Sequence, residues 1–306
     1  MRSVFRTFVL VAAAVTAATV VHADSRIEKT LKLAPGGKFF LDSQAGSVEV
    51  QGVARDGVRV VITATSDDLA EQWTFEIQEL QGEARLIARR KGSDGKSSWF
   101  GGWFNSERAP KFVVEVPSKA DVEVDTGGGS VSVRDLEGAV AVDTSGGAIL
   151  VEKVRGNARL DTAGGSIKVS GLDGSVLADT SGGSIRIAGV TGDIKADTSG
   201  GSISLDAIAG LVDADTSGGS ISATFAKGNN RGGRLETSGG SIRVALDPTI
   251  DLRIDAEASG GGVSSELELT STTTKSRSHL SGTFGKGGQV LRVETSGGSI
   301  SIEPIP

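Results

Sequence analysis

Hydrophobic and polar residues alternate along most of this chain in short runs that end at glycines. In residues 183–200, Ile185 and Ile187 alternate with polar residues, a glycine-bounded break follows, and a second alternating run ends at Thr198. Alternation with a period of two, bounded by glycine turns, predicts two short half-buried strands. We also predict that the Gly-Gly pairs supply the positive φ angles that a tight corner needs.

The same pattern recurs every 18 residues. The heptad Asp-Thr-Ser-Gly-Gly-Ser-Ile, with small variations, starts at Asp125, Asp143, Asp161, Asp179, Asp197 and Asp215, and looser copies start at Asp42, Glu236, Glu257 and Glu294. A β-solenoid requires strict spacing, because each residue stacks on its equivalent about 4.8 Å away. An antiparallel meander is the alternative, but a meander is compatible with strict spacing without requiring it. The prediction is an all-β solenoid with two strands per 18-residue coil, right-handed by the crossover rule.

The first 23 residues have the features of an export signal. Arg2 and Arg6 precede an apolar run, and the small-x-small pattern Val21-His22-Ala23 marks a cleavage site. The mature chain is then expected to contain an N-terminal β region (24–118) and a repeat solenoid (119–306). We expect no transmembrane segment in the mature chain, and a periplasmic or cell-surface location.

Several local expectations concern the two ends of the solenoid. The first coil is predicted to start near Gly36, and residues 46–65 have the strand-turn-strand pattern of a coil. A hairpin is expected within 66–110, with a structureless stretch at 92–109, and residues 270–278 are expected to form a loop. Because proline lacks a backbone N–H, Pro304 and Pro306 are expected to block a terminal strand edge.

Composition excludes several kinds of chemistry. The chain has 44 glycines among 306 residues, no cysteine, and only two histidines, His22 and His279. Disulfides, thiolate nucleophiles and zinc ribbons are therefore excluded, and a multi-histidine metal site or a His-dependent triad has almost nothing to build from. The net charge of −6 argues against nucleic acid as a partner.

Four segments of the sequence resemble the bacterial putative adhesin family of β-strand-repeat proteins. They are LAPGGKFFLDSQAGSVEVQG (33–52), FVVEVPSKADVEVDTGGGSV (112–131), the repeated Thr-Ser-Gly-Gly-Ser-Ile, and GKGGQVLRVETSGGSISIEP (285–304). The resemblance implies an exported or envelope-associated protein with an adhesin-like role. It brings no catalytic residues.

The repeat places one carboxylate per coil in a column along one outer edge. This acidic column is Asp125, Asp143, Asp161, Asp179, Asp197, Asp215 and Glu236. Stacked carboxylates repel unless they are compensated, and Ca²⁺ bound by Asp143, Asp161, Asp179, Asp197 and Asp215 is one hypothesis. The favoured interpretation is that each aspartate accepts hydrogen bonds from the N–H groups of its own corner, as in an Asx-turn.

Three other sets of residues carry specific expectations. Trp99, Phe100, Trp103 and Phe104 crowd around two glycines, and they form either a ligand-binding element or a cap over an open end. The threonine after each repeated acid is expected to point inward and to bond along the ladder; these residues are Thr126, Thr144, Thr162, Thr180, Thr198, Thr216 and Thr237. The basic residues Lys168, Arg186, Lys195, Arg234 and Arg243 are expected to face solvent.

The sequence therefore favours a non-enzymatic, exported binding or structural module of the bacterial envelope, with a glycan or protein as its ligand. The competing hypothesis is a polysaccharide-acting β-helix enzyme. Such a site needs acids in distinct environments, whereas here the acids are repeated members of one ladder. A calcium-stabilised scaffold is a third hypothesis, and no other cofactor is expected.

Overall fold

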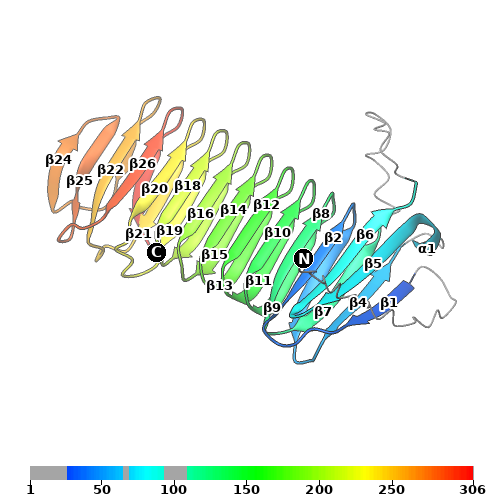
Figure 1. Ribbon diagram of the computed structural model, residues 1–306. Helices are drawn as coiled ribbons and strands as arrows, with labels where there is room; N and C mark the ends of the chain where they lie inside the picture. Colours follow the sequence, from blue (N-terminus) through cyan, green and yellow to red (C-terminus); the bar gives the residue numbers. More distant parts are fainter. Residues whose placement is uncertain (1–25, 65–68, 93–108, 306) are drawn as a thin grey trace, which may run out of the picture.

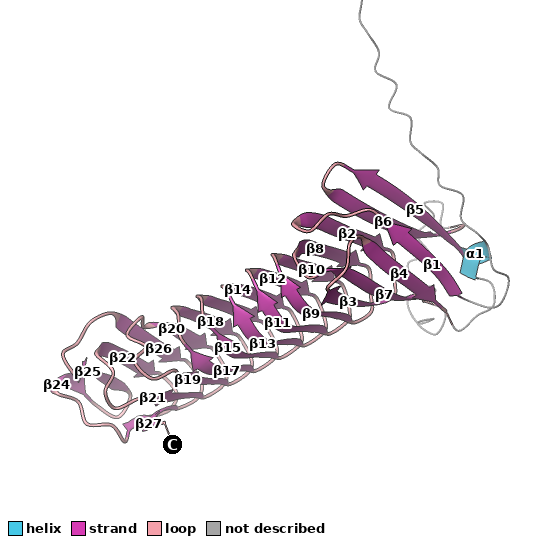
Figure 2. Ribbon diagram, turned by 90° about the horizontal axis from the view of Figure 1, so that it is seen from below, coloured by secondary structure: helices cyan, strands magenta, loops and turns pink. Residues whose placement is uncertain are grey.

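The computed structural model describes residues 26–64, 69–92 and 109–305. These residues form two long β-sheets that face each other along one axis, with a single short helix, α1 (Leu69–Gln72), near the N-terminal end (Figures 1 and 2). We name the 13-stranded sheet sheet A and the 14-stranded sheet sheet B. The predicted all-β architecture is confirmed.

Sheet A has the spatial order β1-β4-β7-β3-β9-β11-β13-β15-β17-β19-β21-β27-β23. The bounds of its strands in that order are Arg26–Leu31, Val58–Thr63, Lys111–Pro117, Ser47–Val53, Val131–Glu137, Ile149–Arg155, Ile167–Asp173, Ile185–Val190, Ile203–Ile208, Ile221–Phe225, Ile242–Leu246, Ile300–Pro304 and Val263–Ser265.

Sheet B has the spatial order β24-β25-β22-β26-β20-β18-β16-β14-β12-β10-β8-β2-β6-β5. The bounds in that order are Ser271–Lys275, His279–Phe284, Leu252–Ala258, Val290–Thr295, Gly233–Thr237, Val212–Thr216, Ile194–Thr198, Val176–Thr180, Ala158–Thr162, Val140–Thr144, Ala120–Thr126, Gly37–Ser43, Glu83–Arg90 and Trp73–Leu80.

Successive coils stack in parallel and in register. In sheet B, Asp179 of β14 pairs with Asp197 of β16, and Thr180 pairs with Thr198. In sheet A, Ile167 of β13 pairs with Ile185 of β15. Each residue therefore lies beside the residue 18 positions later, which is the arrangement of a solenoid and excludes the meander.

The core is the thin space between the two sheets. Large side chains from sheet A, such as Ile185 and Ile187, are fully buried, and the small Ala178 and Ala196 of sheet B are buried with them. Every coil buries only a few such residues, so each depends on the coils above and below it for a continuous core.

Each corner between β-strands of one coil is held by the repeated threonine. The Thr180 hydroxyl donates to the carbonyl oxygen of Gly165 in the preceding coil at 2.8 Å, and the Gly183 N–H donates to the Thr180 hydroxyl oxygen at 3.2 Å. The same two bonds recur at Thr144, Thr162, Thr198, Thr216, Thr237 and Thr295. The predicted inward threonine ladder is confirmed.

The two glycines of a corner have different roles. A Cβ on Gly183 would collide with the Gly165 carbonyl of the preceding coil, whereas a Cβ on Gly182 would be 3.8 Å from its nearest neighbour. Among the described Gly-Gly corners of the repeated heptad, only Gly129 has a positive φ. The prediction that these glycines supply positive φ is therefore wrong, because the second glycine is required for clearance between stacked backbones.

At the N-terminal end the coils do not follow chain order. The predicted hairpin is confirmed as antiparallel β5 and β6, and the first coil is confirmed by the parallel pairing of β2 with β8. However, β6 also pairs with β2, and β7 pairs with β3, so the first coil lies between two later ones.

The prediction that residues 46–65 form a regular coil is wrong. Strand β4 stays in sheet A and pairs antiparallel with both β7 and β1, whereas in a regular coil it would cross to sheet B. In β4, Val60, Val61 and Ile62 are buried in succession. A strand with consecutive buried residues between two partners is suited to this mixed-sheet position and not to the alternating edge of a coil.

The C-terminal end shows the same interleaving. The last coil, β26 and β27, is inserted between β20–β21 and β22–β23, as Figure 1 shows for β26. The expectation that Pro304 lies on the terminal strand of its sheet is wrong, because β23 lies outside β27 and covers Ile300–Ile302. Pro304 itself pairs with Leu246 of β21 and is exposed beyond the end of β23.

The true end of sheet B is built from antiparallel strands. Strand β22 pairs with β25, which pairs with β24 at the outer edge. The residues of β24 are all exposed. The expected loop at 270–278 is thus mainly an edge strand, whose side chains are polar because neither of its faces is buried.

The corner geometry gives a direct test. We expect Gly183→Ala to lower the free energy of unfolding by about 3 kcal/mol, because the new methyl group forces two stacked backbones apart. Gly182→Ala, one residue away, is the matched control and should change it by no more than about 0.5 kcal/mol. Urea unfolding of both variants measures the difference. Equal stability of the two would contradict the stacking assigned to the second glycine.

Candidate functional site

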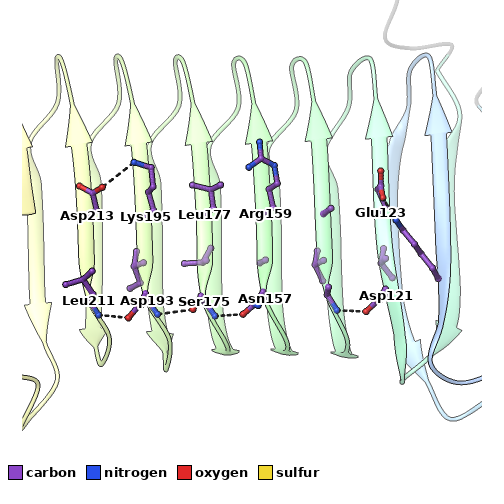
Figure 3. A pocket seen from close by; sticks show the side chains of 18 residues that line it. Asp121, Glu123, Asn157, Arg159, Ser175, Leu177, Asp193, Lys195, Leu211 and Asp213 are labelled. Carbon is purple, nitrogen blue, oxygen red and sulfur yellow. Dashed lines mark hydrogen bonds and ion pairs between the residues drawn. The ribbon is translucent and has the colours of Figure 1, made fainter. Parts of the chain in front are cut away.

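The outer face of sheet B carries a groove that runs across the strands. Figure 3 views this face from outside: each strand runs upward, and later coils lie further to the left, with sheet A behind. This arrangement makes the solenoid right-handed, as the crossover rule predicts. The groove extends from β8 to β18 and has a volume of about 780 Å³.

The central line of the groove is one outward position in six neighbouring coils. It is occupied by Glu123, Ala141, Arg159, Leu177, Lys195 and Asp213, which lie side by side in register. Two residues further along each strand is the acidic column, where the residue is aspartate in every one of these coils. The groove line therefore varies between coils, whereas the acidic column beside it does not.

Polar side chains form a hydrogen-bonded ladder along the lower side of the groove (Figure 3). Asn157 Oδ1 accepts from the Ser175 N–H at 2.9 Å, Ser175 Oγ accepts from the Asp193 N–H at 3.1 Å, and Asp193 Oδ1 accepts from the Leu211 N–H at 2.8 Å. These bonds orient the side chains. In the described residues they leave the Asn157 amide nitrogen and the Ser175 hydroxyl hydrogen free to donate to a ligand.

The charges of the groove are arranged unevenly. Lys195 Nζ lies 3.3 Å from both Asp197 and Asp213, and Lys38 pairs with Glu123. The hydrogen bond to Asp213, with the charge of Asp197, raises the pKa of Lys195, so this amine stays protonated. Arg159, in the middle, forms no ion pair with any described residue and lies between Ala141 and Leu177. Its guanidinium nitrogens are available as hydrogen-bond donors beside the half-buried apolar side chain of Leu177.

The acidic column is longer than the repeat alone shows. Sheet register extends it to Asp42 at one end and to Glu294 and then Glu257 at the other. Burial, with the neighbouring charges of Asp161 and Asp197, raises the pKa of Asp179. Burial and the charges of Asp42 and Asp143 raise the pKa of Asp125 in the same way.

The Asx-turn interpretation of this column is wrong. In the described corners the second glycine N–H is donated to the threonine hydroxyl, and no hydrogen bond joins Asp143, Asp161 or Asp179 to a corner N–H. The threonine is nearer to the corner because it points inward, whereas the aspartate before it points outward. The repulsion between these carboxylates is reduced only in places, by the ion pairs of Lys195 with Asp197 and of Arg89 with Asp42.

No group of three or more histidine, aspartate or glutamate side chains in the described ranges is arranged to hold a metal ion. Calcium binding by Asp143, Asp161, Asp179, Asp197 and Asp215 stays a hypothesis, for which a calorimetric titration with Ca²⁺ is the test. The five predicted solvent-facing basic residues, Lys168, Arg186, Lys195, Arg234 and Arg243, are all exposed, as expected.

Four predictions fall on residues outside the described ranges. They are the export signal at residues 1–23, the structureless stretch at 92–109 apart from its two end residues, the aromatic group Trp99, Phe100, Trp103 and Phe104 within it, and the edge-blocking role of Pro306. The groove, in contrast, was missed by the sequence analysis. Its signal was present, because the residue two positions before the repeated aspartate changes in every coil: Glu123, Ala141, Arg159, Leu177, Lys195 and Asp213.

These features define an all-β repeat protein built as a right-handed β-solenoid. The chain belongs to the Toastrack DUF4097 family, whose model matches residues 37–303. The match covers both sheets except β1 and the last residue of β27. No helix in the described part of the chain is long and apolar enough to span a membrane.

Solved structures similar to this chain include three bacterial proteins. A "putative cell adhesion protein" of Clostridium sporogenes is 12% identical, with 92% of this chain and 100% of that chain covered and a TM-score of 0.24. A "putative adhesin" of Bacteroides fragilis is 11% identical (92% and 98% covered, TM-score 0.43). A "putative lipid binding protein" of Parabacteroides distasonis is 12% identical (92% and 97% covered, TM-score 0.41). No curated protein matches the chain significantly.

The raised pKa of Asp179 predicts the direction of a pH effect. A carboxyl group whose pKa is higher in the folded than in the unfolded protein stabilises the fold below the unfolded value, and that stability is lost as pH rises through the folded value. We therefore expect Asp179→Asn to raise stability at pH 7, by no more than about 1 kcal/mol for an exposed charge, and to leave stability unchanged near pH 3.

Thermal unfolding between pH 3 and pH 7 measures this effect. Asp206→Asn is the matched control, because Asp206 is an exposed acid of sheet A whose partner in β15 is the uncharged Ala188. A loss of stability at pH 7 in Asp179→Asn, or an equal gain in Asp206→Asn, would contradict repulsion within the acidic column.

Proposed function

We propose that this protein is a non-enzymatic, exported binding module of the bacterial envelope that holds a linear, neutral glycan in the groove of sheet B. One observation carries the proposal. The groove line differs in every coil, although the acidic and threonine columns two and three residues after it in the repeat are nearly constant. A uniform ladder cannot distinguish ligands, so specificity has to come from the position that varies.

The dimensions of the groove favour an extended polymer. It crosses six neighbouring strands, from β8 to β18, and five strand spacings of about 4.8 Å give a length of about 24 Å. The direction is along the solenoid axis, so a linear chain contacts one coil after another. A compact ligand would use only a part of this length.

The lining chemistry favours a neutral polymer rich in hydroxyl groups. The groove contains three basic side chains (Lys38, Arg159 and Lys195) and four acidic ones (Asp121, Glu123, Asp193 and Asp213), so it attracts neither a strong polyanion nor a strong polycation. Sugar hydroxyls both donate and accept, and the groove offers donors and acceptors in alternation with the apolar surface of Ala141 and Leu177.

The test is calorimetry with hexasaccharides of β-1,4-linked glucose and of β-1,4-linked N-acetylglucosamine as probes. Arg159→Glu should weaken the binding of the preferred probe at least tenfold, because a hydrogen bond from a charged donor contributes about 1.5–3 kcal/mol. Arg186→Glu makes the same change on the opposite face and should leave affinity within about twofold.

Failure of both probes to bind, or equal affinity of the two variants, would overturn the proposal. Recovery of the probe after long incubation separates binding from the competing enzymatic hypothesis. An intact hexasaccharide supports a binding module, whereas shortened products would indicate a polysaccharide-acting enzyme.

A further inference from the structure

The two outer faces of the solenoid differ in charge. On sheet B the acidic column continues without interruption through all central coils. On sheet A the central outward position is never acidic from β9 to β27. In spatial order this position is Ser132, Leu150, Lys168, Arg186, Ser204, Ser222, Arg243 and Ser301. An acidic protein therefore presents one face whose central line is basic and rich in hydroxyl groups.

The centre of that line contains two adjacent cations. Lys168 of β13 and Arg186 of β15 are register partners, which places their backbones about 4.8 Å apart. Both are exposed, and neither forms an ion pair with a described residue. The next outward positions, two residues further along β13 and β15, are occupied by the uncharged Ser170 and Ala188. Like charges on adjacent strands repel, and this repulsion is relieved when one anion contacts both.

Serine hydroxyls flank the pair of cations. Ser166 Oγ accepts from the Ser184 N–H, and Ser184 Oγ accepts from the Ser202 N–H, each at 3.3 Å. Within the described residues the hydroxyl hydrogens of Ser166 and Ser184 have no acceptor, so they can donate to an anion. A phosphate group, with several acceptor oxygens, is suited to two cations and these donors together.

The shape of the face favours an extended surface over a single small ligand. The coils stack in a straight rod, so the basic line runs along its length (Figures 1 and 2). A planar layer of phosphate head groups could contact Lys168, Arg186 and the more distant Arg243 together. Arg243 Nε is 3.5 Å from Glu303 Oε1, so the charge of Arg243 is partly neutralised. The pair Lys168 and Arg186 is therefore the main contact with the head groups.

The acidic column does not cancel this attraction. Two facing sheets are about 10 Å apart, and the outward side chains add to that separation. Charges on opposite faces are therefore further apart than the Debye length of about 8 Å at physiological ionic strength. The charges of each face therefore interact with nearby ions and lipids almost independently of the charges on the other face.

We propose that sheet A docks on a phosphate-bearing lipid surface through Lys168 and Arg186. The solenoid then lies along the surface with sheet B turned outward, where its groove is open to a polymer. The docking surface is on the opposite face from the groove and does not depend on the proposed glycan function.

The experiment is cosedimentation of the full mature chain with lipid vesicles. Vesicles of phosphatidylcholine with phosphatidylglycerol should bind the protein, vesicles of phosphatidylcholine alone should not, and added salt should weaken binding. We expect Lys168→Glu combined with Arg186→Glu to reduce the vesicle partition coefficient at least tenfold. Arg159→Glu combined with Lys195→Glu, the same change on sheet B, should leave it within about twofold.

Binding of the sheet A double variant at the wild-type level would overturn the proposal, as would failure of the wild type to bind the anionic vesicles. Inorganic phosphate distinguishes a lipid surface from a free ion. Competition by phosphate beyond that of sodium chloride at equal ionic strength would assign the two cations to free phosphate and overturn lipid docking. Circular dichroism and an unchanged midpoint of thermal unfolding confirm that the double variant is folded.

Discussion

Close contact between identical corners of successive coils is the constraint on which the rest of this structure depends. At each corner a buried threonine hydroxyl joins its own coil to the preceding one, through the carbonyl of Gly165 in the case of Thr180. The second glycine lets the backbones approach closely enough for that bond. An insertion of even one residue would exchange inward and outward side chains, so the 18-residue length is as strictly required as the residue types.

The solenoid also has to end, and it does so by changing the order of its coils. The first coil (β2 and β3) and the last coil (β26 and β27) are both covered by coils from elsewhere in the chain. Three of the four outermost described strands, β1, β24 and β5, pair antiparallel with their neighbours, and the fourth, β23, is a three-residue strand parallel to β27. Because an exposed parallel edge is a template for pairing with other chains, covering the regular coils in this way protects the repeat from edge-to-edge association.

Regular stacking has a cost that the outer surfaces reveal. The repeat that places threonine on threonine also places aspartate on aspartate. Burial, together with these neighbouring charges, raises the pKa values of Asp125 and Asp179. Other outward positions vary between coils. Both proposals concern such positions: Arg159 in the groove of sheet B, and Lys168 with Arg186 on sheet A.

The sequence by itself determined the solenoid, its period, the inward threonines and the exposed basic residues, because alternation and an unbroken spacing allow only one way to stack identical corners. It could not determine the order of the coils at the ends. The segments at 46–65, 252–265 and 288–304 all have the local pattern of a coil, and local pattern does not state which coil is the neighbour. The groove was visible only as variation at one position of the repeat. Tertiary structure decided that Glu123, Ala141, Arg159 and Leu177 form one continuous surface, because only stacking brings residues 18 positions apart within about 4.8 Å of each other.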